Sequence, residues 1–163
     1  MRAALPLLSL LFLGFALNCA RAEAPSPASP PSPAVIFPDG TAVQVDLATT
    51  PDQQAKGLMF VDSLPADRGM LFLFDSDERR PFWMKNCLIA LDMVWLDADF
   101  RVADISHDVP PCKADPCPNV FPSGPIRNVL EVQAGFCAAH KLAVGDKLAV
   151  VNLPAQPPSV ATP

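Results

Sequence analysis

The chain has 163 residues, of which half are hydrophobic, and a formal net charge of -5 at pH 7. This length suits one domain with an ordinary hydrophobic core. Because an acidic protein repels phosphate groups and the sequence contains no basic stripe, its composition argues against nucleic acid as a partner.

The first 22 residues have the features of a cleavable secretory signal peptide. Met1-Arg2 gives a positively charged start, Leu5–Leu17 is almost wholly apolar, and Ala20-Arg21-Ala22 offers the small residues that a signal peptidase recognises. The apolar run is about a dozen residues long, short of the ~20 that a transmembrane helix needs. The sequence therefore predicts export to the periplasm or the exterior, without a membrane span.

Proline-rich segments mark both ends of the predicted folded part. Residues 23–33 are rich in Pro, Ser and Ala, a composition typical of an extended tether. Residues 154–163 have a similar composition and are predicted to be a disordered tail. A single domain is therefore expected over residues 34–153.

The domain is predicted to begin with a hairpin and a helix. Two runs of alternating apolar residues, 34–37 and 41–48, flank the turn sequence Pro38-Asp39-Gly40. The next segment, Thr50-Pro51-Asp52-Gln53, combines an N-cap residue, a proline at the first helical position and a capping-box glutamine. A helix should therefore start at residue 51 and reach about Leu58.

The rest of the domain is predicted to consist mainly of short strands, at 70–74, 82–85, 91–96, 101–106, 127–132 and 147–153. Between them we expect a proline-rich loop over 112–125 and a short helix over 134–141. Many short strands with only two short helices indicate a mainly β fold, an antiparallel sandwich or barrel.

Four stretches of the sequence resemble a known family. They are KGLMFVDSLPADRGMLFLF at Lys56–Phe74, FWMKNCLIALDMVWLD at Phe82–Asp97, PPCKADPCP at Pro110–Pro118, and VLEVQAGF with GDKL within Val129–Leu148. The chain resembles the domain of unknown function 192 family of uncharacterised bacterial and archaeal proteins. This resemblance implies a β-rich, jelly-roll-like sandwich, often behind a signal peptide, and no established activity. The family usually has Thr at the position of Cys87.

Four cysteines remain after the signal peptide, which carries Cys19. An even number in an exported protein predicts two disulfides. Cys112 and Cys117 are close in sequence within a proline-stiffened loop, so we expect them to pair. Cys87 and Cys137 are then expected to pair by elimination. The spacing of Cys112 and Cys117 would also suit zinc, but zinc needs two further ligands and no matching pair is present, so no metal site is predicted.

A candidate binding surface lies on the strand predicted over 82–85. Alternation places Trp83 and Lys85 on one face, where an aromatic ring beside a cation suits a sugar or another amphipathic small molecule. The alternative is that Trp83 is a core residue and Lys85 forms a structural ion pair.

Asp92 lies within an apolar run and needs a partner. Lys85 is the nearest cation in sequence, so we expect Asp92 to hold Lys85 in place.

Glu131 is a second carboxylate within an apolar run. If Asp92 and Glu131 converge, they could form a paired acid/base site of a hydrolase, whereas the alternative is two separate buried polar anchors. Four methionines, at positions 59, 70, 84 and 93, allow a Cu(I)-binding protein as a further alternative, although all four lie in apolar runs typical of core.

Together these observations favour an exported small-molecule binding module, for which a carbohydrate is one candidate ligand. The predicted ligand-binding residues are Trp83, Lys85, Asp92 and Glu131. No cofactor-binding motif is found, and no catalytic residue is assigned. A hydrolase with paired carboxylates, a Cu(I) protein and a purely structural or interaction domain stay open as alternatives.

Overall fold

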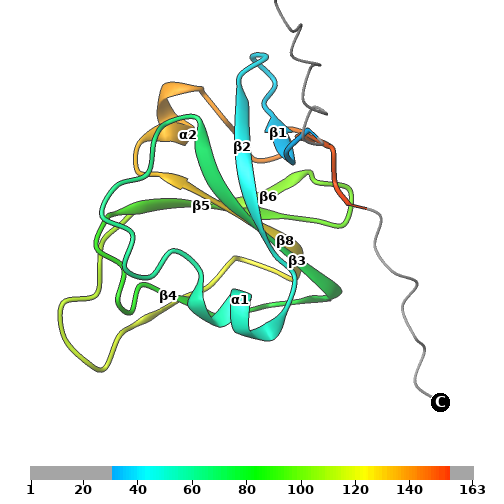
Figure 1. Cartoon of the computed structure of the whole chain (residues 1–163). Helices are drawn as coiled ribbons and strands as arrows, with labels where there is room; N and C mark the ends of the chain where they lie inside the picture. Colours follow the sequence, from blue (N-terminus) through cyan, green and yellow to red (C-terminus); the bar gives the residue numbers. More distant parts are fainter. Residues whose placement is uncertain (1–30, 155–163) are drawn as a thin grey trace, which may run out of the picture. The chain divides into compact units, whose positions relative to one another are not determined.

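The computed structural model describes residues 31–154 (Figure 1). The predicted signal peptide over 1–22, the tether up to residue 30 and the tail from residue 155 lie outside the described residues. Within the described part, no helix is long and apolar enough to cross a membrane.

The predicted opening hairpin and helix are confirmed. Strands β1 (Ala34–Ile36) and β2 (Ala42–Ala48) pair antiparallel around the Pro38-Asp39-Gly40 turn. Helix α1 (Pro51–Lys56) follows, and Thr50 and Gln53 form the complete capping box at its N-terminus. Because these features depend on neighbouring residues alone, the local sequence is enough to predict them.

The remaining elements largely follow the predicted order, and their bounds are β3 (Arg68–Glu78), β4 (Phe82–Trp83), β5 (Leu91–Leu96), β6 (Val102–Val109), β7 (Asn119–Val120), β8 (Ile126–Gln133), α2 (Phe136–Ala139) and β9 (Ala149–Val151). Strand β5 has its predicted bounds, whereas β3 is longer than predicted. The short strand β7 lies in the segment predicted as loop, and it pairs with β4.

Seven strands form one sheet in the order β6-β5-β8-β3-β2-β1-β9, and β4 and β7 form a separate pair. The prediction of a mainly β fold with two short helices is therefore confirmed. Strands β2 and β3 pair in parallel, whereas the other strand pairs of the described sheet are antiparallel. A parallel pair needs a crossover connection, and the segment containing α1 supplies it.

The seven-stranded sheet curls until its two ends meet. Arg101, just before β6, forms an antiparallel bridge with Lys147, just before β9. Two backbone hydrogen bonds reinforce this closure, from Val102 N to the Asp146 carbonyl oxygen (2.8 Å) and from Leu148 N to the Phe100 carbonyl oxygen (3.0 Å). The result is a barrel-like curl in which strands distant in sequence enclose a common interior (Figure 1).

The central strands are buried on both faces and separate two hydrophobic clusters. The interior cluster takes buried residues from six strands of the curled sheet and from Leu148 just before β9, including Val35, Val43, Leu71, Val94, Val102 and Leu130. The outer cluster covers the opposite face of β3, β5 and β8, and it includes Phe72, Met84, Cys87, Leu91, Met93, Trp95 and Val129. Strand alternation explains the division, since Leu71 faces the interior and Phe72 faces outward.

Candidate functional site

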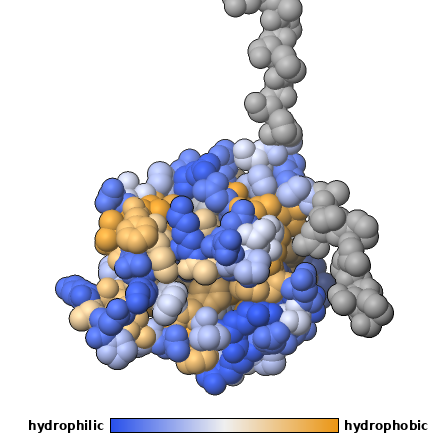
Figure 2. Space-filling model, turned by 60° about the horizontal axis from the view of Figure 1, so that its bottom comes forward, coloured by the Kyte–Doolittle hydropathy of each residue, from blue (hydrophilic) through white to orange (hydrophobic). Residues whose placement is uncertain are grey.

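A pocket of about 290 Å³ opens on the outer face of the sheet, between α1 and β4. Figure 2 brings this side of the molecule forward and shows apolar surface between hydrophilic groups. The pocket is lined by Gln54, Ala55, Lys56, Gly57, Leu58 and Met59 from α1 and the turn after it, by Phe72, Phe74 and Glu78 from β3, by Arg79, Arg80, Pro81, Phe82 and Trp83 up to β4, and by Cys87 and Glu131.

The buried carboxyl group of this lining belongs to Glu131 on β8. Its position on β8 pairs with Met70 of β3 and with Met93 of β5, so its side chain extends to the outer face of the sheet. The residue is only 4% exposed. Its Oε2 atom has no hydrogen-bond partner among the described residues. Burial raises the pKa of Glu131 from 4.5 to about 8, so the group is mainly protonated at pH 7.

A glycine gives the pocket access to this carboxyl group. A Cβ atom at Gly57 would lie 3.3 Å from the Phe72 ring and 3.9 Å from Glu131 Oε2. The φ angle of Gly57 is +46°, in a region that other residues rarely adopt. A side chain at this position would therefore be strained, and it would also occupy the space in front of the carboxyl group.

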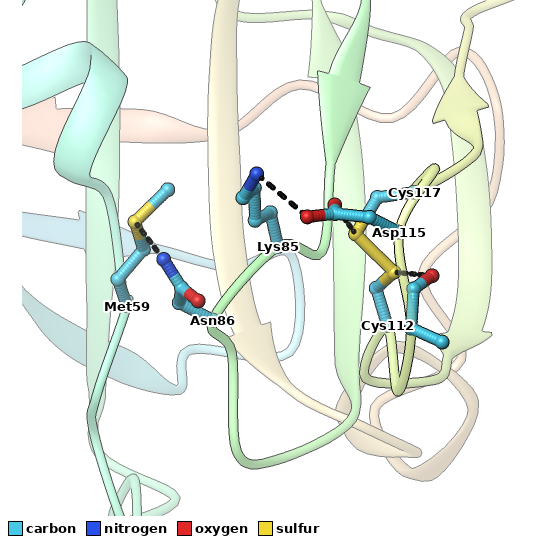
Figure 3. Close-up of a disulfide and its surroundings, with 7 residues drawn as sticks. Met59, Lys85, Asn86, Cys112, Asp115 and Cys117 are labelled. Carbon is cyan, nitrogen blue, oxygen red and sulfur yellow. Dashed lines mark hydrogen bonds and ion pairs between the residues drawn. A yellow bond between two sulfur atoms is a disulfide. The ribbon is translucent and has the colours of Figure 1, made fainter.

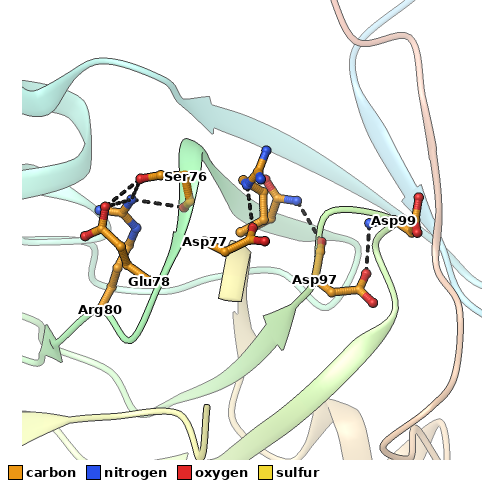
Figure 4. Close-up of polar contacts among 8 residues, drawn as sticks. Ser76, Asp77, Glu78, Arg80, Asp97 and Asp99 are labelled. Atoms are coloured by element: carbon orange, nitrogen blue, oxygen red, sulfur yellow. Dashed lines mark hydrogen bonds and ion pairs between the residues drawn. The ribbon is translucent and has the colours of Figure 1, made fainter. Parts of the chain in front are cut away.

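Cationic side chains surround the pocket. Arg80 Nη2 forms an ion pair with Glu78 Oε1 at 3.1 Å and donates to Ser76 Oγ at 2.8 Å (Figure 4), and its guanidinium lies over the Phe74 ring. Its Nε atom is buried without a partner. Arg79 Nε donates to the Pro122 carbonyl oxygen, so its position is fixed as well. In residues 31–154, Arg80 Nε and Glu131 Oε2 are the two buried side-chain polar atoms without a hydrogen bond.

Cys87 also lines the pocket as a buried free thiol. Its pKa is raised from 9.0 to about 11 by burial and by the nearby charge of Glu131. Since the thiolate is the nucleophilic form of cysteine, this environment suppresses the reactivity of the thiol. The site therefore has binding surfaces but no activated cysteine nucleophile.

The predicted pairing of Cys87 with Cys137 is wrong, because both thiols are free within residues 31–154. Cys87 belongs to the outer cluster and Cys137 to the interior cluster, so the sheet separates them. The Cys112–Cys117 disulfide is confirmed, with a Cα–Cα distance of 5.6 Å.

Trp83 and Lys85 are neighbours, as the alternation predicts, with Lys85 Nζ 5.7 Å from the centre of the Trp83 ring. Trp83 is 45% exposed and lines the pocket. Lys85 instead lines a smaller hollow beside the disulfide, where its Nζ forms an ion pair with Asp115 Oδ2 at 3.1 Å (Figure 3). Asp92 is not its partner, so that prediction is wrong.

Asp92 is a structural anchor on the interior side of the sheet. It pairs with Val132, one position away from the Met93–Glu131 pair, and therefore points to the opposite face from Glu131. Its carboxylate accepts hydrogen bonds from the backbone N–H groups of Asp108 (2.8 Å), Gly135 (3.2 Å) and Cys137 (2.9 Å). Asp92 and Glu131 thus do not converge on a paired-carboxylate site.

The methionines of the proposed Cu(I) alternative do not form one site. Met84 and Met93 are buried in the outer cluster and Met70 packs against it, whereas Met59 lines the pocket. In residues 31–154, no three His, Cys, Asp or Glu side chains are arranged to hold a metal ion.

Several pocket residues were not predicted as ligand-binding residues, above all Gly57, Arg79, Arg80 and Cys87. The adjacent arginines after an apolar strand and the glycine directly after a helix were the available signals in the sequence. Neither signal shows that the two segments meet across β3 and β8.

Comparisons with known proteins place the chain in a family without an assigned activity. The model of DUF192, described as uncharacterized ACR, matches residues 34–150. No curated protein matches the chain.

Two solved structures are similar to it. One, from Novosphingobium aromaticivorans DSM 12444, is a protein of unknown function with 32% identity and a TM-score of 0.65, and the match covers 83% of this chain and 99% of that one. The other, from Sinorhizobium meliloti 1021, is described as a candidate transcription regulator, with 30% identity and a TM-score of 0.65 over 74% of this chain and 93% of that one. On the family match and both structural similarities, the chain belongs to the domain of unknown function 192 family.

Proposed function

We propose that the protein is a small-molecule binding module whose ligand occupies the pocket between α1 and β4. The observation that carries this proposal is the unpartnered Oε2 of Glu131, buried in the lining of a pocket of about 290 Å³. A buried polar atom without a hydrogen bond costs about 1–3 kcal/mol, and a ligand that supplies the missing bond recovers that cost.

The size and walls of the pocket indicate what kind of molecule fits. An apolar cavity of about 150 Å³ holds one benzene molecule, so 290 Å³ suits a compound of about two fused rings or one monosaccharide. Aromatic side chains at Phe72, Phe74, Phe82 and Trp83 form much of the wall. Because a sugar needs many polar partners, these walls favour a ligand with an apolar body and few polar groups over a carbohydrate.

The hydrolase alternative loses its geometric basis, since Asp92 and Glu131 lie on opposite faces of the sheet. Covalent catalysis needs a nucleophile that is hydrogen-bonded to a base. Glu131 has no such partner in the pocket, because the raised pKa of the neighbouring Cys87 keeps that thiol protonated. Binding is therefore the function that the arrangement of residues supports best.

Ligand-observed NMR of a mixture of bicyclic aromatic fragments and monosaccharides tests the proposal. Ala55 is an exposed pocket-lining residue on α1, so Ala55→Trp should block the pocket without disturbing the core. Ala42→Trp, at an exposed position on β2 that does not line the pocket, is the matched control. We expect fragment binding to be lost in the first variant and kept in the second. Equal binding to both variants would place the ligand elsewhere and refute the proposal.

We further propose that the protein is exported and acts in the periplasm or outside the cell. The basis is the composition of residues 1–22, and a disulfide such as Cys112–Cys117 is compatible with an oxidising compartment. The intact mass of the protein purified from its producing cell checks this, since export predicts a chain that starts at Glu23. A mass that corresponds to a start at Met1 would contradict it.

A further inference from the structure

The two unpartnered polar atoms belong to two residues of the pocket lining, one a guanidinium and the other a carboxyl group. Arg80 Nε is a hydrogen-bond donor and needs an acceptor. Glu131, when protonated, can donate a hydrogen bond through its hydroxyl to an acceptor on the ligand. Both groups therefore favour a ligand that carries oxygen atoms able to accept hydrogen bonds.

Charge is distributed unevenly between the mouth and the interior of the pocket. Lys56, Arg79 and Arg80 are the cationic residues of the lining, and the Glu78 ion pair neutralises one of the three charges. Lys56 and Arg79 are exposed, whereas Glu131 is buried. We therefore place these two cationic groups at the mouth of the pocket and the carboxyl group in its interior.

The apolar walls lie between these two polar regions. Phe82 packs edge-on against Phe72 with ring centroids 5.0 Å apart, and Trp83 extends the aromatic surface toward solvent. A planar apolar group inserted here would contact ring faces and edges on more than one side. The pocket thus offers an outer positive region, an aromatic middle and an inner hydrogen-bond donor.

We propose that the ligand is a small amphipathic anion, with its anionic group near Lys56 and Arg79, its apolar body between the aromatic side chains, and an inner oxygen atom that accepts a hydrogen bond from Glu131. This inference rests on the proposed function and specifies the ligand class. An amine of the same size is disfavoured because it meets two unneutralised positive charges at the mouth.

Three probes of equal size separate the possible ligand charges: 6-methoxy-2-naphthoate, its neutral amide, and the corresponding 2-(aminomethyl) compound. The methoxy oxygen can accept a hydrogen bond but cannot donate one. Isothermal titration at pH 7 should show that the carboxylate binds at least about tenfold more tightly than the amine. Lys56→Gln should reduce the affinity for the carboxylate and leave the affinity for the amide unchanged. Equal or tighter binding of the amine would overturn the inference.

The role of Glu131 as donor has its own test. Its proton is lost above pH 8, so raising the pH from 7 to 9 should weaken binding of 6-methoxy-2-naphthoate to the wild-type chain by about tenfold. Cys87, the thiol beside it, titrates near pH 11, outside this range. Glu131→Gln keeps an N–H donor in the same place at every pH and should bind with little pH dependence. Glu78→Gln, which changes the other carboxyl group of the pocket, should keep the wild-type pH dependence.

The results separate the two proposals. Binding of the amide or the amine in preference to the carboxylate, lost in Ala55→Trp, would refute the anionic ligand while supporting the pocket as a binding site. The same pH dependence in the wild-type chain and Glu131→Gln would refute the donor role of Glu131. If none of the three probes binds, the inferred ligand class is wrong, and the fragment and monosaccharide mixture decides separately whether the pocket binds small molecules.

Discussion

Replacing Glu131 by Gln should remove a strong pH dependence from the stability of the fold. The folded-state pKa is raised from 4.5 to about 8, so between these pH values the folded chain binds more protons than the unfolded chain. The free energy of unfolding therefore falls as the pH rises through this range. At about 1.4 kcal/mol for each pKa unit, a shift of this size corresponds to a loss of up to about 5 kcal/mol between pH 4.5 and 8. A glutamine, which does not titrate, contributes no such loss.

Urea unfolding at pH 5, 6, 7, 8 and 9 measures this effect, with fluorescence of the fully buried Trp95 as the signal. Glu131→Gln should gain stability relative to the wild-type chain as the pH rises, and the difference should level off above pH 8. Glu78→Gln is the matched control, since that carboxyl group lines the same pocket but is 57% exposed. Parallel stability curves for the wild-type chain and Glu131→Gln would show that Glu131 titrates normally, and would refute the burial argument.

Three further predictions concern the fold around the pocket. Asp92→Ala should lower the free energy of unfolding by about 3–5 kcal/mol, because it leaves three backbone N–H donors unpaired. A loss below about 1 kcal/mol in urea unfolding would contradict the role of Asp92 as an anchor. Gly69→Ala should strongly destabilise the fold, because the new Cβ would lie 2.7 Å from the backbone carbonyl oxygen of Glu131 on β8. An unchanged melting temperature would disprove that contact. Replacing Cys112 and Cys117 together by Ser should cost about 2 kcal/mol, as expected for a short ring, and a loss of 4 kcal/mol or more in urea unfolding would point to a larger role.

Trp83 is exposed and is not a buried core residue, whereas the sequence left both possibilities open. The strand pattern places Trp83 beside Lys85, and the observed contact agrees. That pattern cannot show whether another element covers the indole ring. The partner of β4 is the short strand β7, which leaves the ring 45% exposed. Exposure thus depends on a segment that lies more than thirty residues away.

Features that depend on neighbouring residues could be predicted without the fold. The capping box of α1, the opening hairpin, the bounds of β5 and the Cys112–Cys117 disulfide all follow from residues within a few positions of one another. The sequence also identified Glu131 as a carboxylate in apolar surroundings, which the structure places in the pocket lining.

Which distant groups meet depends on how the strands pair in the folded chain. In antiparallel strands, a change of one position in the pairing moves a side chain to the opposite face of the sheet. The pairing of β5 with β8 therefore directs Asp92 to the interior and Glu131 to the pocket, and the sheet between the two clusters keeps Cys87 apart from Cys137. No local pattern contains this pairing, because it is set by packing among strands that are far apart along the chain.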